Sequence, residues 1–322
     1  MQEKQITSGM LIKAILAEVE KVIIGKKDVV EKVFMSILSK GHILLDDVPG
    51  VGKTTMATAI SKVLGLKYSR VQFTPDVLPS DIVGFSIYDK QTGDFRYMPG
   101  VVTNTNILLG DEINRTSSKT QSALLEAMEE KQVTVDGKTY PLQDPFVVIA
   151  TQNNVGTAGT QLLPYAQLDR FLTKLSIGYP DYESQMEIIR DRQRANPVDA
   201  IRQVAACRHI LQMQEEVQAV TVKDSIISYI TRLAMASRKH PLLELGVSPR
   251  GAISVSRLAK ARAYMQGRNY AIPEDVIEVF ADVCAHRIIV NQQGKAKKVT
   301  ALQILNHILK AVPVPDQFSE EK

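Results

Sequence analysis

One short segment of the chain combines residues that could hold phosphate groups. Asp47–Thr54 reads DVPGVGKT and stands between a short apolar run and a stretch of helical character. Gly50 and Gly52 allow backbone N–H groups to close around phosphate oxygens, and the start of the following helix adds its dipole. Lys53 is expected to contact the β- and γ-phosphates, and Thr54 to hold Mg²⁺ through its hydroxyl group. The segment therefore predicts binding of ATP or ADP together with Mg²⁺.

The first residue of this segment departs from the usual pattern of a phosphate loop, which has glycine there. A carboxylate that faced the phosphates would repel them, so we expect the side chain of Asp47 to point away. Contact with phosphate and Mg²⁺ is expected from residues 50–55. The complete set of loop residues predicted at the nucleotide is Asp47, Val48, Pro49, Gly50, Val51, Gly52, Lys53, Thr54 and Thr55.

Two adjacent acids follow a second apolar run. Asp111 and Glu112 come directly after Asn106–Gly110, which reads NILLG and is typical of a buried strand. The carboxyl ends of parallel strands form the crevice in which such sheets bind ligands. We expect Asp111 to bind Mg²⁺ and Glu112 to orient and polarise the attacking water, which predicts hydrolysis of the nucleotide.

The elements that must position these residues alternate between strand and helix. Helical character is expected over Lys53–Leu64 and Ser117–Glu130. Five short apolar runs suit buried strands: His42–Leu45, Val71–Phe73, Ile107–Leu109, Phe146–Ala150 and Leu175–Ile177. This alternation indicates an α/β fold, with a parallel sheet that is covered on both faces by helices.

Two polar segments interrupt the alternation, and the chain changes character near residue 180. Residues 84–99 contain a Thr-Gly turn and residues 132–141 an Asp-Gly turn, so each is predicted to form a hairpin that projects from the body. After Pro180 helical patterns dominate. We therefore expect a nucleotide-binding core over residues 1–180, and a small helical domain with the C-terminal tail over residues 181–322.

Composition excludes several other classes of protein. The net charge of +4 over 322 residues is too small to argue for nucleic acid by itself. The two cysteines, Cys207 and Cys284, do not have the spacing of a metal site. No apolar run reaches the roughly 18 residues of a membrane span, and no signal-type apolar core follows the N-terminus. We expect a cytoplasmic protein.

Four longer runs give the sequence a family resemblance. They are VQFTPDVLPSDIVG (71–84), LLGDEINRTSSKTQSALLEAMEE (108–130), VIATQN (148–153) and AQLDRF (166–171). In order and spacing they resemble the MoxR family of AAA+ ATPases, over roughly Val22 to Val290. The resemblance implies an αβα parallel-sheet P-loop domain followed by a small all-helical lid domain. It also implies that the two hairpins are inserts, which in this family face a central pore or the client.

The resemblance assigns roles to residues outside the phosphate loop. It makes Asn153 the first sensor, which would hold the attacking water and touch the γ-phosphate. It makes Arg170 the arginine finger, which would reach the nucleotide of a neighbouring subunit, and Arg250 the second sensor. Ile24 and Gly25 lie where the family packs the adenine. The predicted catalytic set is Lys53, Glu112, Asn153, Arg170 and Arg250, and the predicted metal ligands are Thr54 and Asp111.

The function implied is Mg²⁺-dependent ATP hydrolysis by a homo-oligomer, a hexameric ring that assembles with ATP. Such a ring would remodel or mature client proteins, and a protein with a von Willebrand factor A-type domain is a further expected partner. Two alternatives stay open: a nucleotide-gated binding module with slow turnover, and an AAA+ protein that acts on DNA. The hairpin over 84–99 carries Lys90 and Arg96 among aromatic residues, but an ordinary amphipathic hairpin has the same composition. We expect no nucleic-acid partner.

Overall fold

The structure is a computed structural model that describes residues 8–48, 50–152, 163–194 and 196–315. Its contacts divide the chain into two compact units. The first consists of residues 1–34, 42–163 and 175–212, and the second of residues 35–41, 164–174 and 213–322. This division differs from the boundary expected near residue 180, because the segment Leu175–Gln212 packs with the first unit.

The centre of the first unit is a five-stranded sheet in the order β2-β5-β8-β1-β9. The neighbours β2–β5, β5–β8 and β8–β1 run parallel. Parallel pairing brings the carboxyl ends of β1, β5 and β8 to the same edge of the sheet. The strands are β1 (Ile43–Asp46), β2 (Tyr68–Gln72), β5 (Ile107–Asp111), β8 (Val147–Gln152) and β9 (Thr173–Leu175).

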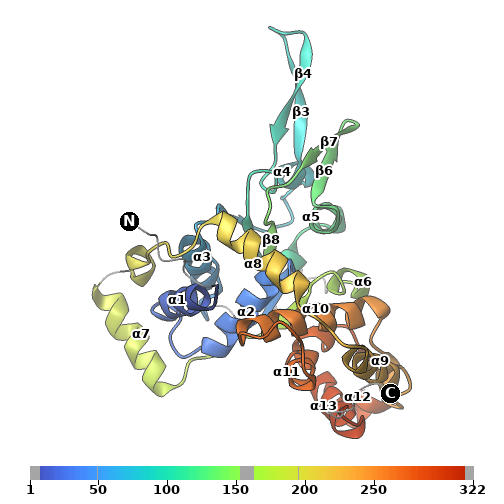
Figure 1. The fold of residues 1–322 in the computed structure, drawn as a ribbon. Coiled ribbons are helices and arrows are strands. Elements are labelled where there is room, and N and C mark those ends of the chain that lie inside the picture. Colours follow the sequence, from blue (N-terminus) through green and yellow to red (C-terminus); the bar gives the residue numbers. More distant parts are fainter. Residues whose placement is uncertain (1–7, 49, 153–162, 195, 316–322) are drawn as a thin grey trace. The chain divides into compact units, whose positions relative to one another are not determined.

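The inner strands are apolar up to their last one or two residues because helices cover both faces of the sheet. All residues of β5 and β8 are buried. Figure 1 shows α3 and α1 on one side of the sheet and α5 on the other, and α3 also contacts α1 and β5. The helices of this unit are α1 (Ser8–Glu20), α3 (Lys53–Leu64), α4 (Pro79–Val83), α5 (Ser118–Glu130) and α7 (Tyr182–Arg194), with 3₁₀ turns at Ile113–Arg115 and Pro197–Ala200.

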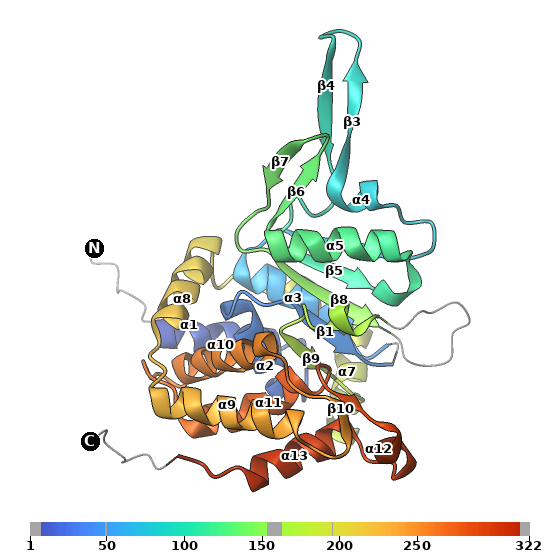
Figure 2. The same ribbon diagram turned by 90° about the vertical axis from the view of Figure 1, so that its right-hand side faces the viewer.

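Both expected hairpins are present and project from the same side of the first unit (Figure 2). One consists of β3 (Gly84–Asp89) and β4 (Asp94–Pro99), and the other of β6 (Gln132–Val135) and β7 (Lys138–Pro141). The ring of Tyr97 stacks on that of Tyr140 with centroids 3.9 Å apart, so the two hairpins are in contact.

The second unit is built mainly from helices. They are α6 (Tyr165–Leu168), α9 (Asp224–Arg238), α10 (Pro249–Met265), α11 (Pro273–Cys284), α12 (Gln292–Ala296) and α13 (Ala301–Ala311). The division between the units runs through α2 (Lys27–Leu38), α8 (Cys207–Ala219) and β9. A two-stranded antiparallel ribbon, β10 (Leu243–Leu245) and β11 (Ile289–Val290), adds to these helices. Among the described residues, no helix combines the length and apolar character that crossing a bilayer requires.

Candidate active site

The phosphate loop connects the buried strand β1 to the helix α3. Gly50 and Gly52 have φ angles of 87° and 97°, in the left-handed region that glycine enters without strain. A Cβ at either position would meet no atom within 4 Å, so backbone conformation rather than space demands glycine. Gly52 is the N-cap of α3 and supplies no side-chain hydrogen bond to the first turn. The first N–H groups of α3 therefore suit an anion.

Lys53 is held against this loop. Its side chain is buried, and its Nζ donates a hydrogen bond to the backbone oxygen of Asp47 over 2.6 Å. Burial lowers the pKa of Lys53, while the negative charges of Asp47, Asp111, Asp46 and Glu112 oppose that shift. The carboxylates thus help to keep the lysine in the cationic form that a phosphate group requires.

The carboxylate of Asp47 turns away from the loop, as expected from the sequence. It accepts hydrogen bonds from Ser176 Oγ over 2.9 Å, from Gly178 N over 3.1 Å and from the backbone N–H of Ile177. The acid therefore ties the start of the phosphate loop to the segment that follows β9. Pro49 lies outside the described residues.

The two predicted acids stand at the carboxyl end of β5. Asp111 is buried, and its Oδ2 accepts a hydrogen bond from Arg70 Nε over 2.7 Å. Its Oδ1 accepts one from Thr151 Oγ1 over 3.2 Å, and the same hydroxyl oxygen accepts the backbone N–H of Glu112 over 2.9 Å. Glu112 has a φ of 56°, a left-handed conformation that is uncommon for a residue other than glycine.

The carboxylate of Glu112 already has two donors. Its Oε2 accepts hydrogen bonds from Gln72 Nε2 over 3.0 Å and from Arg115 Nη1 over 2.7 Å. Sequence reasoning missed Arg70, Gln72 and Thr151 as members of the site. The available signal was the period of two along β2, which places residues 70 and 72 on one face of that strand.

A cavity of about 350 Å³ collects these groups. Its lining contains the phosphate loop together with both acids and their partners on β2 and β8. The lining residues are Gly50, Gly52, Lys53, Thr54, Thr55, Arg70, Gln72, Asp111, Glu112 and Thr151. Cationic donors and backbone N–H groups thus meet a pair of carboxylates in one compartment, as phosphoryl transfer requires.

A second cavity of about 420 Å³ shares Gly50, Gly52 and Thr55 with the first. Much of its lining is apolar and suits a nucleoside base: Val22, Ile23, Ile24, Val51, Met56, Ile177, Pro180 and Ile188. Ile24 was expected here, whereas the residues after Ile177 were not. Gly25 does not line the cavity, but a Cβ there would come within 2.1 Å of Ser184 Oγ, so glycine permits this close packing.

The donor set fits Mg²⁺. Thr54 and Asp111 line the same cavity and offer a hydroxyl and a carboxylate oxygen, the ligand type that Mg²⁺ prefers. No cluster of three or more His, Cys, Asp or Glu side chains suited to a metal occurs in the part of the chain that the structure describes. Mg²⁺ in nucleotide sites takes one or two carboxylates and completes its shell with water and phosphate oxygens, so the two residues suffice.

The other predicted site residues belong to the second unit or lie outside the residues that the structure describes. Asn153 lies outside the described residues. Arg170 follows α6, and its neighbour Asp169 forms an ion pair with the buried Arg287 over 2.8 Å. Arg250 lies in the first turn of α10, whose N-cap Ser248 accepts the N–H of Gly251 over 3.0 Å. The sensor and finger roles of these residues stay predictions.

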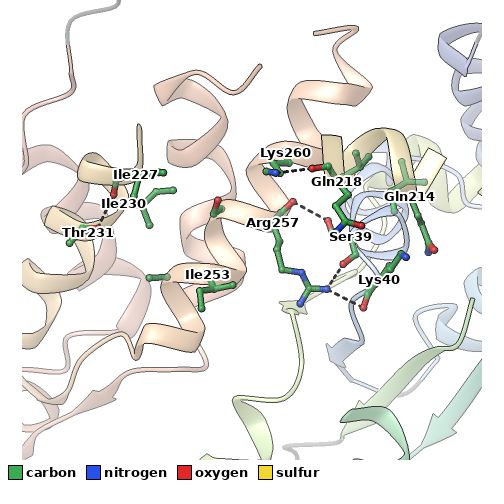
Figure 3. A pocket seen from close by; sticks show the side chains of 14 residues that line it. Ser39, Lys40, Gln214, Gln218, Ile227, Ile230, Thr231, Ile253, Arg257 and Lys260 are labelled. Atoms are coloured by element: carbon green, nitrogen blue, oxygen red, sulfur yellow. Dashed lines mark hydrogen bonds between the residues drawn. The ribbon is translucent and has the colours of Figure 1, made fainter. Parts of the chain in front are cut away.

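The second unit contains a cavity of its own, of about 570 Å³ (Figure 3). None of the predicted site residues lines it. Two of its cations are engaged by backbone oxygens: Arg257 donates to Ser39 and Lys40, and Lys260 to Gln218. The larger cavity therefore lacks the loop and the acids that define the site in the first unit.

Comparison with known proteins agrees with this geometry. Residues 42–173 match the model of the "ATPase family associated with various cellular activities (AAA)", and residues 235–308 match an AAA lid domain. The chain is 46% identical over 301 residues to the uncharacterized protein YeaC of Bacillus subtilis, covering 94% of each. It is 39% identical to the chaperone MoxR1 of Mycobacterium tuberculosis, over 92% of this chain and 81% of the relative. A crystal structure from Cytophaga hutchinsonii superposes with a TM-score of 0.89 at 39% identity, covering 96% of both chains.

The fold and the site thus define an AAA+ ATPase, with an αβα nucleotide domain and a helical lid. Within that class, the chain belongs to the MoxR family.

Proposed function

We propose that this chain hydrolyses ATP in a Mg²⁺-dependent reaction and works as an oligomeric ring on partner proteins. The observation that carries the hydrolytic part is the single cavity that joins the phosphate loop to Asp111 and Glu112. A protein that only bound nucleotide would need the loop, but it would not need an acid pair at the end of β5.

Several residues of the cavity, and two arginines outside it, have roles in the proposed reaction. Lys53 and the N–H groups at the start of α3 bind the phosphate oxygens. Thr54 and Asp111 would hold Mg²⁺, which when bound neutralises charge on the transferring phosphoryl group. Glu112 orients the attacking water and polarises it. Arg170 and Arg250 would offset the remaining developing charge, with Arg170 supplied by a neighbouring subunit.

The proposal that proteins are the substrates rests on two observations. A relative of 39% identity is named a chaperone. The hairpin β3–β4 leaves large apolar side chains in solvent: Phe85, Tyr88 and Phe95 are 48%, 56% and 69% exposed. Exposed apolar groups gathered on a projecting element are typical of an interaction surface.

Slow turnover is the second candidate, and the contacts of Glu112 favour it. A carboxylate that accepts hydrogen bonds from both Gln72 and Arg115 has less capacity left to polarise a water. On this view the chain is a nucleotide-gated binding module, whose hydrolysis acts as a timer. Turnover measured with and without a partner protein separates the two candidates, because a timer stays slow when the partner is bound.

The hydrolytic role of Glu112 can be tested with Glu112→Gln. We expect the variant to bind ATP with close to normal affinity, because the amide keeps the shape of the side chain. Turnover should fall by about two orders of magnitude or more, since the group that polarises water is lost. Fluorescent-nucleotide binding and phosphate release measure the two quantities. Glu126→Gln, at an exposed position on α5, is the matched control and should leave both unchanged. Unchanged turnover in Glu112→Gln would contradict the assignment.

A further inference from the structure

Two side chains of the edge strand β2 reach across to the acids at the end of β5. The register pairs Gln72 with Asp111 and Arg70 with Leu109, so residues 70 and 72 lie on one face, next to the acids. Arg70 Nε donates to Asp111 Oδ2 over 2.7 Å, and Arg70 Nη2 donates to Gln72 Oε1 over 3.3 Å. Gln72 continues the chain of contacts to Glu112. A chain of hydrogen bonds therefore runs from Asp111, the acid proposed to bind the metal, through Arg70 and Gln72 to Glu112.

The two side chains of the ion pair between Arg70 and Asp111 differ in their exposure to solvent. The side chain of Asp111 is 11% exposed, whereas that of Arg70 is 49% exposed. A buried carboxylate needs a cationic partner or hydrogen-bond donors, while a half-exposed arginine loses little when it turns into water. Of the two residues, Arg70 is therefore the one that can move at low cost.

The carboxylate of Asp111 is also the group that would bind Mg²⁺. Both of its oxygens already accept hydrogen bonds, Oδ2 from Arg70 and Oδ1 from Thr151. A guanidinium group and a divalent cation on the same carboxylate repel each other, and both draw on the same oxygen lone pairs. The hydroxyl of Thr151 carries no net charge, so only Arg70 is a competitor in this sense.

We propose that Arg70 competes with the divalent metal for Asp111. In the absence of metal, Arg70 satisfies the buried carboxylate. When a metal–nucleotide complex binds, the hydrogen bond between Arg70 and Asp111 breaks. The N–H donors of Arg70 remain in a cavity that also contains Lys53 and Thr54, where the phosphates are expected. Arg70 thereby raises the concentration of Mg²⁺ that the site needs. This inference rests on the proposed binding of Mg²⁺ and ATP.

The test compares Arg70→Gln and Arg70→Lys with the wild-type chain. Binding of fluorescent ADP is measured while free Mg²⁺ is varied, which gives the Mg²⁺ concentration for half of the full effect on affinity. Arg70→Gln should lower that concentration by about tenfold, the factor that corresponds to one charge-assisted hydrogen bond. Arg70→Lys keeps the charge and should stay near the wild type. Arg96→Gln, on the exposed strand β4, is the control for loss of one positive charge elsewhere in the same unit.

The outcomes separate this inference from the proposed function. If the wild type binds ADP with no dependence on Mg²⁺, the proposed cofactor is wrong. If the wild type depends on Mg²⁺ and Arg70→Gln leaves or raises the Mg²⁺ requirement, Arg70 is not a competitor of the metal. A general loss of structure would weaken ADP binding equally with and without Mg²⁺, and circular dichroism and the melting temperature would reveal it.

Discussion

A single acid decides how the start of the phosphate loop is held. Asp47 stands where a phosphate loop usually has glycine, and its carboxylate accepts three hydrogen bonds from the segment Ser176–Gly178. The backbone oxygen of the same residue accepts the hydrogen bond from Lys53. Asp47 thus acts as an anchor between the loop and the chain that follows β9, and it shapes the nucleotide site indirectly.

This anchoring predicts whether a substitution of Asp47 weakens or tightens nucleotide binding. Asp47→Ala should weaken ADP binding by about tenfold, because the loop loses its charge-assisted hydrogen bonds. Asp47→Asn, which keeps an acceptor oxygen, should lose less. A carboxylate that faced the phosphates would give the opposite result, since its removal would relieve repulsion and tighten binding. Titration with fluorescent ADP distinguishes the two, and tighter binding by Asp47→Ala would contradict the anchor.

At the scale of single residues, the sequence predicts those whose role depends on a short local motif. Five residues could be assigned to the site because each stands in a turn or at the end of a strand that orients it. They are Gly50, Gly52, Lys53, Asp111 and Glu112. Arg70 and Gln72 could not be placed. Their role depends on β2 being the neighbour of β5, and the order of strands in a sheet is not a local property of the chain.

At the scale of elements, one buried acid joins two helices of the second unit. Asp275 is fully buried in the first turn of α11, where its side chain accepts the backbone N–H of Ile272 over 2.9 Å. It also forms ion pairs with Arg262 of α10 over 2.6 Å and with Arg268 over 2.7 Å. Burial alone would raise the pKa of Asp275, but the hydrogen bonds from Arg268, Ile272 and Arg262 together hold it below its ordinary value of 3.8.

Removing this charge should destabilise the second unit. Asp275→Asn leaves two arginines facing a neutral amide, and breaking a buried ion pair costs about 3–5 kcal/mol of unfolding free energy. Denaturant unfolding followed by circular dichroism measures the loss. Glu278→Gln, an exposed change on the same helix, is the control and should stay within about 0.5 kcal/mol of the wild type.

The same acid gives a pH dependence with a defined sign. A carboxyl group whose pKa is lowered on folding contributes stability above its unfolded pKa and loses it as the pH falls through the folded value. The contribution of Asp275 should therefore be fully present at neutral pH and decline below about pH 4. The stability difference between the wild type and Asp275→Asn should shrink over that range. A difference that is constant with pH would contradict the role of the charge.

The helices and strands differ in how well their existence and bounds can be predicted from their sequences. The helix Lys53–Leu64 was predicted to the residue, because a glycine loop precedes it and Gly65 ends it in a left-handed conformation. The Asp136-Gly137 turn, in which both residues have positive φ, likewise identifies the hairpin of β6 and β7. The ribbon of β10 and β11 was not predicted, since its strands have only three and two residues and no periodicity can emerge at that length.

At the scale of the whole molecule, the proposed reaction needs groups from both units. The phosphate loop and the acid pair belong to the first unit, and Arg170 and Arg250 to the second. The segment that carries Arg170 is fixed within its own unit by Arg287, which pairs with Asp169 and donates to the backbone oxygens of Phe171 and Leu172. A rigid support of this kind suits the role proposed for Arg170 as an arginine finger.

Sharing of the site between subunits can be tested by mixing two inactive variants. Arg170→Ala keeps Glu112 but lacks the finger, and Glu112→Gln keeps the finger but lacks the group that polarises water. In a head-to-tail ring formed by random mixing of equal amounts, about a quarter of the interfaces would combine an intact Glu112 with an intact Arg170, so turnover should recover towards that fraction. Mixing Glu112→Gln with the double variant creates no complete site and is the control. If Arg170 served the nucleotide of its own chain, no mixture would recover, and the absence of recovery in rings of proven mixed composition would rule out the shared site.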